Sequence, residues 1–436
     1  MAFEEMWEAL RPIGRAPGGG YRRFSWTAAD RECREWFTQE ARSRGLAVER
    51  DRNGNLVAWW DVAGGAGPVG GAGAAGMLRS AAGIAASAMT HGVHRGATAH
   101  VRRDAVLTGS HLDSVPDGGA YDGPLGVVSA FAAIDLLRER GRTPRRPLGV
   151  AVFAEEEGAR FGVACLGSRL VTGAIDPERA RGLRDGDGVT WAAAMAAEGY
   201  DPAEIGPDPG FLASVGCFVE LHVEQGCALT ALTAPVGVAS AIWPHGRWRF
   251  DFTGQGNHAG TTLLGDRRDP MLPFAHTVLA ARSAAESLDA VATMGKVRVT
   301  PNGVNAIPSS VQAWLDARAP SDEAVRATVA RIREAAAAAA ERHGVEVGLA
   351  EESYTSVVDF EAGLRDRLVK VLGDVPVLPT GAGHDAGILS AHLPTAMVFV
   401  RNPTGVSHAP EEHAPMADCL AGVSALADVL EELACR

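Results

Sequence analysis

Residues 109–126 read GSHLDSVPDGGAYDGPLG and follow an apolar run at 105–107 that is typical of a buried strand. Three side chains in this stretch, His111, Asp113 and Asp122, can bind metal ions or protons. A buried strand followed by such a loop is how an α/β sheet presents a site at its strand ends. We therefore expect His111 and Asp122 to ligate a metal ion and Asp113 to orient the His111 ring. Taken alone, such a stretch is more often a strand followed by a polar turn.

The same pattern recurs three times further along the chain. An apolar run at 147–154 is followed by Glu156 and Glu157, a run at 217–223 contains His222, and a run at 396–400 precedes His408. Imidazoles and carboxylates in this number suit Zn²⁺ or Mn²⁺. Two ions that share one carboxylate would use five ligands and hydrolyse a substrate together. One glutamate of the tandem pair would then be free to act as the general base.

Composition excludes several classes of function. The chain has 436 residues, is 46% hydrophobic and 22% charged, and carries a formal net charge of −12, so we expect a globular protein that does not bind nucleic acid. No apolar run is long enough to cross a bilayer, and the first residues lack the basic and apolar regions of an export signal. The six cysteines form no C-x-x-C pair, which favours reduced thiols in the cytoplasm.

The periodicity of the chain predicts two domains. Strands alternate with helices at 1–240 and 354–436, which indicates an α/β catalytic domain with a mixed, mostly parallel sheet flanked by helices. Residues 241–353 contain two long helices and several strands, which indicates an inserted α+β domain. Residues 64–100 are rich in Gly and Ala, and we interpret them as an insertion with a short helix near 77–89. A tolerated loop is the first interpretation of this insertion, and a lid is the second.

Seven segments together resemble one family, the amidase, hydantoinase/carbamoylase family, which includes N-carbamoyl-L-amino acid hydrolases and allantoate amidohydrolases. The segments are GSHLDSVPDGGAYDGPLGV, EEEGARFG, ELHVEQG, NHAGTT, PNGVNAIPSSVQAWLDAR, GAGHDAG and GVSHAPEE. The resemblance extends from about residue 5 to residue 435 and excludes the Gly/Ala-rich insertion. It implies a homodimeric dinuclear metallohydrolase within the wider superfamily of aminoacylases and carboxypeptidases, in which residues 241–353 would be the lid and dimerisation domain.

The resemblance also assigns the metal ligands. His111 and His222 would hold one divalent ion, Glu157 and His408 the other, and Asp122 would bridge them. Glu156 would be the general base, and Asp113 would orient the His111 ring. The ions implied are two per subunit, Zn²⁺ or Mn²⁺, with Co²⁺ or Ni²⁺ as substitutes in vitro.

The remaining roles concern the substrate, a small molecule with a carboxylate. The resemblance implies that Gln225 lies beside the substrate and that His258 reaches across the dimer to the developing oxyanion. Asn305 and Arg318 would bind the substrate carboxylate, for which a planar guanidinium is well shaped.

Two departures from the family pattern leave the substrate open. Leu263-Leu264 follow HAGTT where the family has Pro-Met, and the segment 243–248, WPHGRW, is unusual. We expect hydrolysis of a linear C–N bond in a carbamoyl, ureido or allantoate-like compound. The alternatives are an N-acyl or N-formyl amino acid hydrolase, a dipeptidase, or a binding protein without catalysis.

Overall fold

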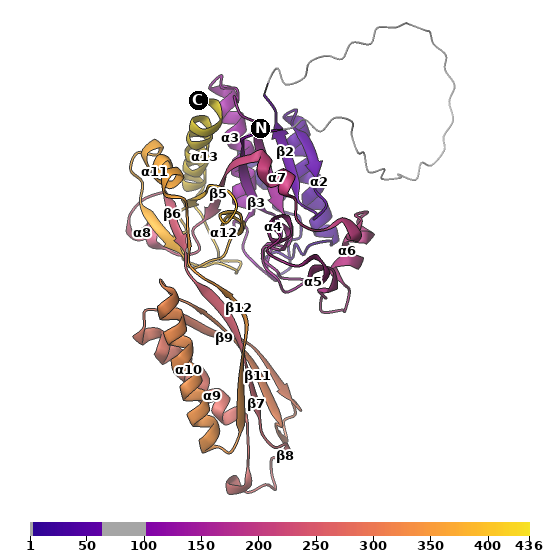
Figure 1. Cartoon of the computed structure of the whole chain (residues 1–436), viewed down its shortest axis with the longest axis vertical. Coiled ribbons are helices and arrows are strands. Elements are labelled where there is room, and N and C mark those ends of the chain that lie inside the picture. The colour runs from indigo at the N-terminus through magenta and orange to yellow at the C-terminus, as the bar shows by residue number, and fades with distance from the viewer. Residues whose placement is uncertain (1–2, 63–101) are drawn as a thin grey trace, which may run out of the picture. The chain divides into compact units, whose positions relative to one another are not determined.

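The computed structural model describes residues 3–62 and 102–436, and the predicted insertion at 64–100 lies outside them. Within these residues none of the helices is both long and apolar enough to span a membrane. The chain forms two compact units (Figure 1). The first contains residues 1–238, 361–377 and 384–436, and the second contains residues 239–360 and 378–383. The second unit is therefore longer than the predicted 241–353, because β14 (Val377–Thr380) returns to pair with β6 (Val236–Ile242).

The first unit is built on one sheet whose strands run in the order β1-β2-β4-β3-β5-β15-β6. The four central strands are parallel, whereas β1, β2 and β6 pair in antiparallel fashion, so the sheet is mixed and only its centre is parallel. The strands of this unit are β1 (Ala47–Arg50), β2 (Leu56–Trp60), β3 (Ala105–His111), β4 (Leu148–Phe153), β5 (Val215–Val223) and β15 (Thr395–Val400), with β6 leading into the second unit.

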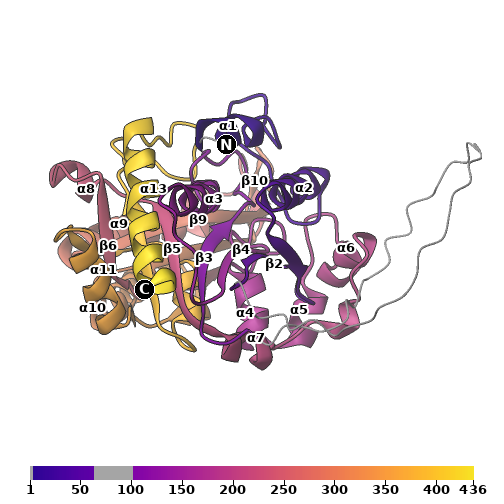
Figure 2. The same cartoon turned by 90° about the horizontal axis from the view of Figure 1, so that it is seen from above.

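Helices α3 (Pro124–Glu139) and α13 (Met416–Leu430) pack against each other, and α3 lies across β3 and β5 (Figure 2). Twelve residues of α3 are buried, because its sequence is apolar on nearly every side. The other helices of the unit are α1 (Phe3–Leu10), α2 (Ala28–Ser43), α4 (Leu166–Thr172), α5 (Pro177–Gly182), α6 (Trp191–Ala197), η1 (Pro202–Glu204), α7 (Pro209–Ser214), α8 (Ala228–Ala231), α11 (Ala362–Val371), α12 (Asp385–Leu389) and η3 (Glu431–Cys435).

The sequence pattern predicts a helix over 160–172, but α4 begins only at Leu166, so that prediction was wrong for residues 160–165. The backbone of Cys165 is in the left-handed region, with a φ of 54°. The backbone N–H groups of Arg160 and Phe161 donate to the Glu155 side chain. A buried carboxylate therefore satisfies backbone groups that a helix would otherwise use.

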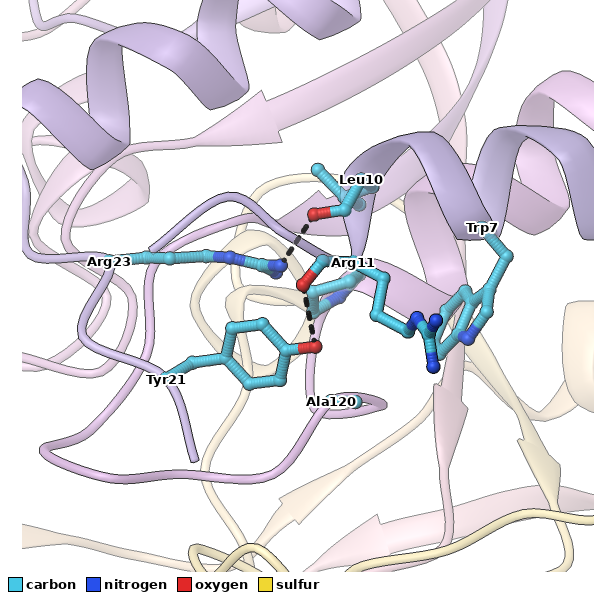
Figure 3. A pocket seen from close by; sticks show the side chains of 7 residues that line it. Trp7, Leu10, Arg11, Tyr21, Arg23 and Ala120 are labelled. Carbon is cyan, nitrogen blue, oxygen red and sulfur yellow. Dashed lines mark hydrogen bonds between the residues drawn. The ribbon is translucent and has the colours of Figure 1, made fainter. Parts of the chain in front are cut away.

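The N-terminal segment fastens the loop that carries Asp122. The Tyr21 N–H donates to the Gly118 carbonyl at 3.0 Å, and the Trp7 and Tyr121 rings lie 4.9 Å apart. A small pocket between this segment and the loop is lined by Trp7, Leu10, Arg11, Tyr21, Arg23, Ala120 and Pro124 (Figure 3). There the Tyr21 hydroxyl donates to the Arg11 carbonyl and the Arg23 guanidinium donates to the Leu10 carbonyl, so both side chains tie the end of α1 to this turn.

The second unit has a four-stranded antiparallel sheet in the order β12-β7-β11-β9, with α9 and α10 packed on one face (Figure 1). Alternation in β11 is complete, with every second residue buried, as expected for a sheet covered on one side. The elements are β7 (His245–Thr253), β8 (Asn257–His258), η2 (Leu264–Asp266), α9 (Met271–Ser287), β9 (Val291–Thr300), β10 (Ala306–Ile307), β11 (Ser310–Arg318), α10 (Asp322–Arg342), β12 (Glu346–Thr355) and β13 (Val358–Asp359).

Candidate metal centre

The parallel centre of the first sheet brings the predicted ligands together. His111 is the last residue of β3, His222 lies one residue before the end of β5, and Glu157 follows β4 by four residues. His408 follows β15 in the chain. These four strands are adjacent in the order β4-β3-β5-β15, so their carboxyl ends meet at one edge.

Asp122 lies at the centre of this group. Its Oδ1 is 3.4 Å from Nε2 of His111 and 3.1 Å from Nε2 of His222, and its Oδ2 is 3.3 Å from Nε2 of His408. The Glu157 Oε2 is 3.5 Å from the same nitrogen of His408. The result is two trios of candidate ligands that share Asp122.

The donor atoms fit divalent cations. Two ligands bound to one tetrahedral zinc ion at about 2.1 Å lie roughly 3.4 Å from each other, which is close to the separations around Asp122. The His111 Nε2 is buried and has no hydrogen-bond partner. In His222 the Nδ1 atom is 2.8 Å from the Val223 carbonyl, to which it donates, so Nε2 carries the lone pair that a metal would use; here that atom accepts the Gly123 N–H at 3.2 Å.

The charges of the centre also favour cations. Burial alone would raise the pKa of Asp122, but the three imidazoles around it hold that pKa well below its usual range. Burial raises the pKa of Glu156 to about 8, and it also raises the pKa of Glu157, in each case with a contribution from neighbouring carboxylates. Bound divalent ions would offset this repulsion and allow both glutamates to ionise.

Glu156 and Glu157 face different neighbours. The Glu156 Oε2 is 3.7 Å from the His111 Nε2, and its Oε1 accepts the Cys165 thiol at 3.3 Å. Glu157, in contrast, belongs to the trio of Asp122 and His408. This difference agrees with a ligand role for Glu157 and places Glu156 next to His111 but in neither trio.

Asp113 makes contacts with the glutamate pair that the sequence did not indicate. Its backbone carbonyl, at 3.1 Å, is the nearest partner of the His111 Nδ1, whereas its carboxylate oxygen is 3.6 Å away. The carboxylate instead accepts the N–H groups of Glu156 and Glu157, at 3.2 and 3.1 Å. Asp113 therefore links the β3 loop to the glutamate pair in addition to facing the histidine ring.

Gln225, whose position beside the substrate was predicted, makes a further contact, and three buried residues of the centre, Glu412, His384 and Asp385, were given no role from the sequence. Gln225 Nε2 donates to the Asp122 Oδ2 at 2.7 Å, so this residue, expected beside the substrate, also contacts the bridging carboxylate. Glu412 accepts the Asp122 N–H at 2.9 Å. His384 is buried with its ring 4.5 Å from the His222 ring, and Asp385 accepts the Ser168 hydroxyl at 2.5 Å. Glu412 and His384 lie in two of the segments that carry the family resemblance, but their spacing in the sequence does not reveal which partners they contact.

His258 and Asn305 belong to the second unit and lie side by side. β8 pairs with β10, so that His258 faces Ala306, and the Asn305 carbonyl accepts the Ala259 N–H at 3.0 Å. Both side chains are exposed. The His258 Nδ1 accepts the N–H groups of Gly260 and Thr261, which leaves its proton on Nε2 as an exposed donor.

Arg318 lies at the opposite end of the same sheet. It ends β11, where it pairs with His245, whereas Ser310 at the start of β11 pairs with Thr253 near β8. The eight steps from Ser310 to Arg318 span roughly 26 Å at about 3.3 Å per residue. The Arg318 guanidinium is held by both carboxylate oxygens of Asp316, at 2.7 and 3.1 Å. Arg318 and Asn305 of one subunit therefore cannot both contact the same small carboxylate. The expected contact of both residues with the substrate carboxylate would need one of them from a second subunit.

Comparisons with known proteins agree with this geometry. Residues 107–432 match the family described as peptidase family M20/M25/M40. The chain is 32% identical to the N-carbamoyl-L-amino acid amidohydrolase of Geobacillus stearothermophilus, over 99% of this chain and 98% of the relative. It is 30% identical to the allantoate amidohydrolase of Escherichia coli, with the same coverage.

A solved structure gives the same result for the fold. A hydantoinase/carbamoylase family amidase from Burkholderia vietnamiensis superposes with a TM-score of 0.82 at 29% identity, over 100% of this chain and 98% of that one. The predicted α/β fold and the resemblance drawn from the sequence motifs are thereby confirmed. The chain belongs to the M20/M25/M40 peptidase family and, within it, to the amidases of the hydantoinase/carbamoylase family.

Proposed function

We propose that this protein is a dinuclear amidohydrolase that cleaves a linear carbamoyl or ureido C–N bond in a small carboxylate-bearing substrate. The observation that carries the proposal is the pair of ligand trios that share Asp122. Curated relatives of similar length include N-carbamoyl-L-amino acid amidohydrolase, allantoate amidohydrolase and ureidoglycolate hydrolase, all of which act on such groups by their names.

His111, His222 and Asp122 would hold one ion, and Glu157, His408 and Asp122 the other. Two divalent ions there would supply Lewis acidity to the carbonyl of the scissile group and make water at the site more acidic. Glu156 takes the proton of the attacking water at Oε2 and returns it to the leaving nitrogen. Because Oε1 accepts the Cys165 thiol, only Oε2 is directed to this task.

The active enzyme is proposed to be a homodimer. Arg318 lies far from His258 and Asn305 within one chain, so a site that uses all three must take some of them from a second copy. The exposed Nε2–H of His258 is then the donor to the developing oxyanion of the partner's substrate, as the family resemblance implies.

The second unit offers a surface for such an interface. Leu263 and Leu264, next to β8, are 73% and 82% exposed, and Leu279 on α9 is 70% exposed. β9 is an edge strand of the sheet, and its Val291 is 53% exposed. Exposed apolar side chains beside an edge strand are typical of surfaces that a partner covers. The two leucines that depart from the family pattern would belong to this interface.

Complementation tests the dimer. His258→Ala and Glu156→Gln should each be inactive as homodimers, but mixed and re-equilibrated subunits should regain part of the activity, because one site of each heterodimer has both wild-type residues. Glu156→Gln mixed with Asp122→Asn is the matched control, since both changes lie in one unit and no heterodimer site is complete. If verified heterodimers of the first pair stay inactive, the shared site is rejected.

The substrate is identified by a panel on enzyme loaded with Mn²⁺ or Zn²⁺, in which ammonia release reports hydrolysis of carbamoyl and ureido groups and newly formed amino groups report cleavage of N-formyl amino acids and dipeptides. N-carbamoyl-L-amino acids, allantoate and ureidoglycolate should be hydrolysed, whereas N-formyl amino acids and dipeptides should not. Activity on dipeptides alone would reject the proposed bond type.

We also propose a cytoplasmic location, supported by six cysteines that are all unpaired in the structure.

A further inference from the structure

Glu412 is a buried carboxylate that lies against the candidate metal centre without belonging to either ligand trio. It is 4% exposed, and its Oε1 accepts two successive backbone N–H groups, those of Tyr121 at 2.8 Å and Asp122 at 2.9 Å. Successive N–H groups that point at one oxygen form a nest for an anion. The backbone of the bridging residue itself is therefore fixed by this side chain.

The loop is shaped closely around the carboxylate. A Cβ atom added at Gly119 would lie 2.4 Å from the Glu412 Oε1, so only glycine allows this approach. The loop residues thus enclose one oxygen of Glu412, and a displaced carboxylate would leave two buried N–H groups without a partner.

The other oxygen of Glu412 reaches the bridging carboxylate through a side chain. Its Oε2 lies 3.1 Å from the Ser407 hydroxyl, which is also 3.3 Å from the Asp122 Oδ2. Gln225 donates to both the Asp122 Oδ2, at 2.7 Å, and the Ser407 hydroxyl, at 3.2 Å. Ser407 has one proton to donate, so it joins the two carboxylates and cannot satisfy both at once.

We propose that Glu412 is the positioning residue of the metal centre: it fixes the backbone and the carboxylate of Asp122 so that one oxygen faces each ligand trio. The inference rests on the proposed dinuclear function. A carboxylate that bridges two ions must be held in one rotamer, and outer partners of ligands commonly supply that restraint. Glu412 does not touch the substrate in this role.

Four variants test the role: Glu412→Ala, Glu412→Asp, Glu412→Gln and, as a control, Tyr21→Ala. The Gln carbonyl can accept both N–H groups while its amide donates to Ser407. Asp keeps the charge but is one methylene shorter, so it cannot reach the nest. Tyr21→Ala removes the hydroxyl that donates to the Arg11 carbonyl and the ring that lines the pocket beside the same loop, but it keeps the backbone N–H that donates to Gly118 and leaves the Asp122 N–H untouched.

The affinity for Zn²⁺ alone is measured by chelator competition, and the unfolding temperature of the metal-free protein is measured beside it. We expect Glu412→Ala and Glu412→Asp to bind at least one ion roughly 10- to 100-fold more weakly. Glu412→Gln should bind close to the wild type, and Tyr21→Ala should lose stability without losing affinity. Wild-type affinity in folded Glu412→Asp, or equal losses in Tyr21→Ala, would overturn the positioning role. A wild type that binds no ion would instead reject the proposed function itself.

Discussion

Replacing Glu156 by Gln separates catalysis from metal binding. The amide oxygen can still accept the Cys165 thiol, and a neutral side chain removes a buried carboxylate whose pKa is raised to about 8 by burial, so the fold should not suffer. What is lost is the basic Oε2 near His111. General bases contribute about 10²- to 10⁴-fold, which corresponds to about 3–5 kcal/mol of activation free energy.

The assay combines metal content with single-turnover ammonia release. We expect Glu156→Gln to hold two ions per subunit and to react at least about 100-fold more slowly than the wild type. Glu157→Gln is the matched variant, since it removes a member of the His408 trio and should hold fewer ions. The reasoning is refuted if Glu156→Gln loses an ion while Glu157→Gln keeps both, or if Glu156→Gln retains most of the wild-type rate.

Three other changes have defined outcomes. Arg318→Ala should lower kcat/KM roughly 100-fold, about 3 kcal/mol for a charge-assisted bidentate contact, with a smaller loss in Asp316→Asn, and equal activity of Arg318→Ala on carboxylate and amide substrates would contradict this. Gly109→Ala should destabilise the fold by about 3 kcal/mol or more in denaturant unfolding, because Gly109 has a φ of 133° and a Cβ would lie 2.0 Å from the Ala151 carbonyl oxygen. Burial raises the pKa of Asp51 from 3.8 to about 6, so the stability that its protonated form contributes should be lost as pH rises through 6. The unfolding free energy of the wild type, measured relative to that of Asp51→Asn, should fall between pH 3.8 and about 6. A difference that stays constant over this pH range would exclude the effect.

The sequence was informative about the centre of the sheet and the ligands. β3, β4 and β15 are completely buried, so their apolar runs are uninterrupted and easy to recognise. Because the ligands follow such runs, their meeting at one edge could be predicted without a structure. β6 was missed, since it joins the two units and pairs on its far side with residues distant in the chain.

The residues behind the ligands could not be predicted. Glu412 reaches the Asp122 backbone across 290 residues, and nothing in the sequence marks that contact. The antiparallel pairing of β2 with β4 was also hidden, because a strand of alternating or apolar residues does not reveal the direction of its partner. The opposite positions of Arg318 and Asn305 likewise depend on the register of β11, which the sequence pattern leaves open.

Anomalous diffraction from crystals grown with Zn²⁺ or Mn²⁺ tests the dinuclear centre most directly. We predict two peaks per subunit, one on each side of the Asp122 carboxylate, the first within bonding distance of His111 and His222 and the second beside His408. A single peak among Glu220, His222 and His384, the other buried group of suitable ligands in the described residues, would contradict the assignment. The absence of any peak within bonding distance of Asp122 would contradict it as well.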